Sequence, residues 1–184
     1  KEGDVVTSAK QRLTVIGVEL PKQKIMHTEW MHADCLADYY HVDVFSEEHW
    51  KILENYFKEY VKRGCNMMLT PLFTSPLDTA VGLERTTTQL IKVEVVKGEY
   101  RFEFSELKRW IDLCKKCGIE YYEMSHLFSQ WGAKYAPKVV AEVDGKEEKI
   151  FGWHTQAVGE YTRFLKAFLP QLIEKLKEWN IDQV

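Results

Sequence analysis

A short stretch near the amino terminus, residues 25–41, is rich in side chains that can stack, hydrogen-bond and titrate. If the stretch is extended, alternation places Trp30, His32 and Asp34 on one face. An indole, an imidazole and a carboxylate in one row suit a polar ligand, because each group would need a partner if it were buried in a dry core. The alternative is that Trp30 belongs to the core while His32 and Asp34 bond to neighbouring loops.

Composition restricts the classes of function. The chain has 184 residues, of which 45% are hydrophobic, and a net charge of −3. That length suits one domain or part of a larger one. The lack of a basic run argues against nucleic acid as a partner, and no apolar run approaches the ~20 residues of a membrane span. Six Trp, nine Tyr and nine Phe suit a carbohydrate-binding surface as well as a well-packed core.

The four cysteines are Cys35, Cys65, Cys114 and Cys117. They are too few for a disulfide framework in a chain of this length, so we interpret all four as reduced thiols. Cys114 and Cys117 form a C-x-x-C, but no second pair completes a zinc site, and we predict no metal or other cofactor. Reduced thiols favour a cytoplasmic protein. The amino terminus shows no signal-peptide pattern, and we expect that the sequence is cut at both ends, so we make no prediction of its location.

Short apolar strands alternate with amphipathic helices along the chain. The patterns predict strands over 13–20, 25–31, 66–72 and 119–126, and helices over 47–63, 106–117 and 155–179. Hairpins are predicted at Lys97-Gly98 and Asp144-Gly145, a loop over 33–45, and a kink or break at Pro170. Ser46 and Ser105 are expected to cap the first two helices, and Gly64 and Gly118 to end them.

The predicted fold is α/β, part of a (β/α)8 barrel. Helices between short buried strands indicate parallel β-α units, and long loops after the strands with tight turns at the other end are typical of the barrel. Three complete units and the approach to a fourth are present, whereas a full barrel has eight. We therefore expect strands 25–31, 66–72 and 119–126 to be adjacent and parallel in that order. The open edge of such a sheet favours self-association.

Three motifs resemble the catalytic domain of glycoside hydrolase family 123, the β-N-acetylgalactosaminidase-like proteins. They are W-M-H-A-D at 30–34, N-M-M-L-T-P-L-F-T-S-P-L-D-T-A at 66–80 and S-H-L-F-S-Q-W-G-A at 125–133, followed by F-G-W at 151–153. The resemblance runs from about residue 21 onward. It implies that residues 1–20 are the end of a preceding β-sandwich or a linker strand. Residues 21–184 would then be the N-terminal portion of a (β/α)8 catalytic domain.

The resemblance also implies a retaining, substrate-assisted mechanism. The 2-acetamido oxygen of the sugar attacks the anomeric carbon, an aspartate orients that amide, and a glutamate protonates the leaving oxygen, an exception to the two-carboxylate scheme. In the family this Asp-Glu pair follows the fourth strand, and no adjacent Asp-Glu occurs in these 184 residues. We therefore predict no catalytic residue here and expect the pair beyond Val184.

The resemblance carries a sugar-binding wall onto this chain. The predicted members are Trp30, His32, Asp34, His126, Trp131 and Trp153. The expected partner is a glycan, a β-N-acetylgalactosaminide or another N-acetylhexosaminide. Two alternatives stay open. One is a metal-dependent barrel hydrolase with His32, Asp34 and His126 as ligands, and the other is a non-catalytic sugar-binding or structural half-barrel.

Overall fold

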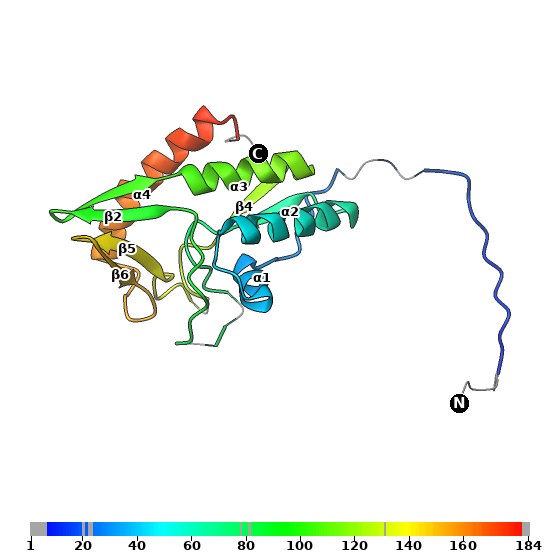
Figure 1. Ribbon diagram of the computed structural model, residues 1–184, viewed down its shortest axis with the longest axis horizontal. Helices are drawn as coiled ribbons and strands as arrows, with labels where there is room; N and C mark the ends of the chain where they lie inside the picture. Colours follow the sequence, from blue (N-terminus) through cyan, green and yellow to red (C-terminus); the bar gives the residue numbers. More distant parts are fainter. Residues whose placement is uncertain are drawn as a thin grey trace.

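The structure, a computed structural model, describes residues 7–19, 21, 24–77, 79–80, 82–130 and 132–181. Its elements are α1 (Ala33–Tyr40), α2 (Glu47–Lys62), β1 (Met67–Thr70), β2 (Lys92–Val96), β3 (Glu99–Glu103), α3 (Ser105–Cys117), β4 (Tyr121–Met124), β5 (Val139–Val143), β6 (Lys146–Phe151) and α4 (Glu160–Glu178). Figure 1 shows α2 beside α3, and α4 lying across the green and yellow strands. No helix in the described ranges is long and apolar enough to span a membrane.

Two sheets form the β structure. In the smaller sheet, β1 pairs in parallel with β4, with Met67 opposite Tyr121 and Thr70 opposite Met124. The larger sheet has the order β3-β2-β5-β6, in which two hairpins join through a parallel pairing of β2 with β5. The α/β class, both hairpins and the parallel pairing of the strands predicted over 66–72 and 119–126 are confirmed. The described residues close no barrel, and a partial-barrel arrangement stays a prediction.

The prediction of a strand over 25–31 is wrong, although this segment lies beside β1. The backbone N–H groups of Asn66 and Met67 both donate to the carbonyl oxygen of His27, at 3.1 Å each. The Asn66 side chain accepts from the His27 N–H at 2.8 Å and donates to the carbonyl of Ile25 at 3.1 Å. Because a side chain satisfies these backbone groups, they are not available for a strand ladder.

The predicted loop over 33–45 contains a helix, α1. His32 stands at its N-cap, where Ser, Thr, Asp or Asn would have indicated the start of a helix. The local sequence pattern therefore did not predict this helix. Buried Leu36 and Ala37 give α1 its inward face. The helix ends at Tyr40, and His41 follows in the left-handed region with φ 55°.

Three other boundaries differ from the sequence predictions. The helix α3 begins at Ser105, so this residue lies in its first turn and is not the N-cap. The last helix begins at Glu160 and runs unbroken through Pro170. Residues 13–19 contain no strand, and Leu13 is 87% exposed in the extended segment that Figure 1 draws in blue. The assignment of residues 1–20 to a preceding domain stays a prediction.

Aromatic side chains pack α2 against α3 and α4 against the larger sheet. Between α2 and α3, the rings of Phe57 and Trp110 meet edge to face with centroids 5.0 Å apart. On α4, Phe164 and Phe168 lie one turn apart and are fully buried against the larger sheet. The ring centroid of Phe168 lies 5.0 Å from that of Phe73 and 5.2 Å from that of Phe102. Each fully buried large apolar side chain contributes about 1.5–3 kcal/mol of transfer free energy, so these contacts fix the position of α4.

A buried histidine joins α2 to α1. His49 accepts through Nδ1 from the backbone N–H of Phe45 at 2.9 Å, and Nε2 lies 3.0 Å from the carbonyl oxygen of Ala33. With Nδ1 accepting, Nε2 carries the proton and donates to Ala33, so the ring is neutral. Burial lowers the pKa of His49 from its usual 6.5.

The depressed pKa of His49 predicts that the protein loses stability in mildly acidic solution. As the pH falls below 6.5, this histidine takes up a proton in the unfolded chain but stays neutral in the folded chain. The free energy of unfolding therefore decreases as the pH falls, until the pH reaches the lower pKa of the folded state. One proton corresponds to a slope of about 1.4 kcal/mol per pH unit at most. Urea unfolding between pH 5 and 8 checks this, with His49→Gln removing part of the slope. The exposed His154→Gln variant is the control, and an equal change of slope in that variant would contradict the assignment.

Candidate functional site

Trp30 and His126 lie together at the end of β4, the strand that contains Glu123. The Trp30 Nε1–H donates to Glu123 Oε2 at 3.0 Å. The indole meets the His126 ring edge to face, with centroids 5.6 Å apart and an interplanar angle of 77°. Trp30 is 43% exposed, so part of its ring surface is open to solvent. We call Trp30, Glu123 and His126 the Trp30 cluster.

A tyrosine from α2 sets the backbone that leads into Trp30. Tyr60 Oη accepts from the N–H of Glu29 at 2.8 Å and lies 2.7 Å from the carbonyl oxygen of Met67 in β1. Burial raises the pKa of Tyr60, so its hydroxyl keeps a proton to donate. One side chain thereby ties the segment before Trp30 to β1.

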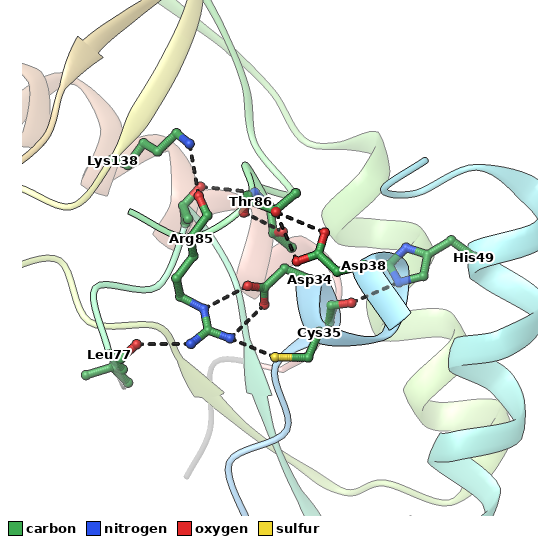
Figure 2. Close-up of polar contacts among 11 residues, drawn as sticks. Asp34, Cys35, Asp38, His49, Leu77, Arg85, Thr86 and Lys138 are labelled. Carbon is green, nitrogen blue, oxygen red and sulfur yellow. Dashed lines mark hydrogen bonds and ion pairs between the residues drawn. The ribbon is translucent and has the colours of Figure 1, made fainter. Parts of the chain in front are cut away.

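A buried ion pair holds α1 in place. Arg85 donates from Nε to Asp34 Oδ2 at 2.8 Å and from Nη2 to Oδ1 at 3.1 Å, a bidentate pair. The side chain of Arg85 is 11% exposed and that of Asp34 is 8% exposed. Arg85 also donates from Nη1 to the carbonyl oxygen of Leu77 at 3.2 Å, and its Nη2 lies 3.0 Å from Cys35 Sγ. Figure 2 shows the guanidinium enclosed by these three acceptors.

The loop segment 83–86 makes further contacts around this ion pair. Thr86 Oγ1 lies 3.0 Å from both oxygens of Asp38, which is one helical turn after Asp34. On the other side of the segment, Lys138 Nζ donates to the carbonyl oxygen of Arg85 at 3.0 Å. Figure 2 shows Asp34 and Asp38 facing the segment from α1 and Lys138 approaching it from the opposite side. Successive residues of the segment thus fasten α1 to the start of β5.

His32 and Asp34 line a small cavity next to the ends of the strands. Leu69 and Pro71, at the end of β1 and just after it, form the other wall of the cavity. Its volume of about 10 Å³ has room for one water molecule at most, so a sugar ring does not fit there. The exposed part of Trp30 is the surface that a sugar ring can reach.

Trp153, another predicted wall residue, does not join the Trp30 cluster. Trp153 donates from Nε1 to the carbonyl oxygen of Leu83 at 2.9 Å and packs on Tyr135, with centroids 5.8 Å apart. It therefore contacts the segment 83–86, which reaches Asp34 through Arg85. Trp131 lies outside the described residues.

The donor arrangement does not favour the metal alternative. Both oxygens of Asp34 already accept from a guanidinium, and a second cation beside Arg85 would be repelled. Among the residues that the structure describes, no three His, Cys, Asp or Glu side chains are grouped to hold a metal ion.

Sequence reasoning did not select Arg85, Tyr60 or Glu123 for the site. Arg85 lies in a Thr-rich loop, 51 residues from its carboxylate partner, and no local pattern links the two. Glu123 stands among the polar residues that end a predicted strand, and that position was the available signal.

Comparison with known proteins identifies the family. The model of the glycoside hydrolase 123 catalytic domain matches residues 30–184. A solved structure of a family 123 glycoside hydrolase from Clostridium perfringens, studied for glycolipid glycan hydrolysis, superposes with a TM-score of 0.60 at 21% sequence identity. The alignment covers 81% of this chain and 26% of that one, so the chain spans about a quarter of the length of the solved structure. No curated protein matches the chain.

The buried ion pair predicts unequal effects of two charge-removing substitutions. Arg85→Met leaves the carboxylate of Asp34 buried without its counter-charge, and loss of one partner of a buried pair costs about 3–5 kcal/mol. Lys108→Gln removes an exposed pair with Asp112 on α3 and should cost much less. Urea unfolding measures both.

The double variant Asp34→Asn, Arg85→Met provides the second arm. It leaves no buried charge and should be more stable than Arg85→Met alone. Equal losses for Arg85→Met and Lys108→Gln would show that the Asp34–Arg85 pair is not a structural link.

Proposed function

This chain belongs to the glycoside hydrolase 123 family through its catalytic domain. We propose that the protein hydrolyses the glycosidic bonds of N-acetylhexosaminides, and that its preferred substrates are β-N-acetylgalactosaminides. The family match over residues 30–184 carries this proposal. The superposition with the Clostridium perfringens enzyme supports the fold on which it relies.

We propose a retaining, substrate-assisted reaction. The acetamido oxygen of the sugar bonds to the anomeric carbon while the bond to the leaving oxygen breaks, and a carboxylic acid gives its proton to that oxygen. Water then attacks the anomeric carbon and gives a proton back to the carboxylate, the bond from that carbon to the acetamido oxygen breaks, and the sugar leaves with its configuration retained. The glutamate of an adjacent Asp-Glu pair is the proton donor, and the aspartate orients the amide. No such pair occurs in residues 1–184, so we place it beyond residue 184 in the sequence.

The part of this chain is to bind the sugar. The Trp30 cluster presents an aromatic surface next to a carboxylate and an imidazole, the combination that packs on sugar C–H groups and bonds to hydroxyls. His32, Trp131 and Trp153 stay predicted members of this wall. For Asp34 we propose a positioning role, because Arg85 already occupies both of its oxygens.

Dependence on the acetamido group tests the proposed reaction. The natural full-length protein should hydrolyse an aryl N-acetyl-β-galactosaminide, and the matching aryl β-galactoside should react slower by roughly a hundredfold or more, because it lacks the internal nucleophile. An N-trifluoroacetyl substrate, whose amide oxygen is a poorer nucleophile, should fall between the two. Release of the aryl alcohol measures all three rates.

Two results would contradict this proposal. Equal rates for the acetamido sugar and the plain galactoside would rule out assistance by the substrate. Turnover by the 184-residue chain alone, above a buffer control, would show that the catalytic groups lie within these 184 residues.

The edge of β4 supports the proposal that the 184-residue chain self-associates. Within the described residues β1 is the one strand that pairs with β4, and a cavity of about 510 Å³ beside β4 is lined in part by Met26, Met67 and Met124. An unpaired strand edge next to apolar side chains is a template for another chain. Light scattering at high concentration should detect dimers or larger species.

A charge at this edge should weaken the association. Met124→Lys puts a cation among the methionines that line the cavity, whereas Ile173→Lys changes a 49% exposed residue on α4 and serves as the control. A monodisperse monomer in the unsubstituted protein would contradict the proposal.

A further inference from the structure

Trp30 combines two properties that ordinary packing does not require together. Its side chain is 43% exposed, so it contributes less to the core than the buried tryptophans Trp50 and Trp110. Yet it is held by a hydrogen bond to Glu123, 93 residues away in the chain, and by the ring of His126. An exposed ring held by two distant side chains is suited to receive something on its open surface.

The position of Glu123 explains how it reaches the indole. Glu123 lies opposite Leu69 in the parallel pairing of β4 with β1. The neighbouring Tyr122 points the other way, with its hydroxyl 3.5 Å from the carbonyl oxygen of Ile111 in α3. Since side chains alternate along a strand, Glu123 faces away from α3, toward the segment that carries Trp30.

We propose that Glu123 is a positioning residue whose carboxylate, together with the His126 ring, keeps the Trp30 indole in one orientation for stacking against the apolar face of an N-acetylhexosamine. This inference rests on the proposed function. The indole N–H is a donor without acceptor capacity and a carboxylate is a strong acceptor, so the pair sets the direction of the ring. A ring already oriented loses less conformational freedom when a ligand binds.

Kinetics of the full-length protein with an aryl N-acetyl-β-galactosaminide test the role. Trp30→Ala should raise KM about tenfold through loss of the stacking surface. Glu123→Ala should raise KM roughly three- to tenfold with kcat within about twofold, because it disorders the ring without touching the reacting atoms. Glu123→Gln keeps an amide oxygen as acceptor and should restore most of the loss.

A double-mutant cycle separates positioning from direct contact. In the Trp30→Ala background, Glu123→Ala should raise KM by less than about twofold, because its effect passes through the indole. The same three- to tenfold loss in that background would mean that Glu123 binds the substrate itself and would overturn the proposal. A fall in kcat in place of a rise in KM would also overturn it.

A second readout does not depend on activity. The ring current of Trp30 should displace the imidazole C–H resonances of His126, which are assigned by their disappearance in His126→Gln. Glu123→Ala and Trp30→Ala should both move these resonances, and Glu123→Gln should leave them near their original positions. Unchanged resonances in Glu123→Ala would overturn the proposal. If they move while the aryl glycoside is not hydrolysed, the positioning role stands and the proposed function fails.

Discussion

The buried pair of Asp34 and Arg85 is the contact on which the arrangement of the two sheets depends. Asp34 belongs to α1, beside the smaller sheet, and Arg85 belongs to the loop that leads into the larger one. Burying both charges is costly, and bidentate geometry with further acceptors offsets that cost. Separating the two side chains while either stays buried would leave a charge without a partner. The pair therefore holds α1 against the loop that contains Arg85, while Tyr60 and Asn66 hold the segment that leads into Trp30.

Local signals were sufficient for the turns and for the major helices. Lys97 and Gly98 have φ values of 51° and 80°, and Asp144 and Gly145 have 48° and 77°. Two successive residues with positive φ make the tight hairpin turn that these dipeptides predict. The joining of the hairpins was not predictable, because it depends on a distant side chain. Gln89 bonds to both the N–H and the carbonyl of Val140, which links the approach to β2 with β5.

The same division applies to the candidate site. Polar residues at the ends of predicted strands pointed to Trp30 and His126, and the structure brings these two together. The partners that hold the site did not show in the sequence. Arg85 looks like any solvated cation of a polar loop until the fold brings it against Asp34. A side chain that acts through another residue has no spacing rule of its own, whereas residues that share one strand end do.

The irregular backbone before α1 has a consequence for the binding surface. In a regular strand Trp30, His32 and Asp34 would share one face, and Met31 would point to the other. Here Met31 and His32, which are successive residues, line the same small cavity, while Trp30 turns to Glu123. Side-chain contacts from Asn66 and Tyr60 replace the ladder and release the segment from strict alternation. That freedom allows the indole to stand exposed at the end of β4 while Met31 and His32 line the small cavity.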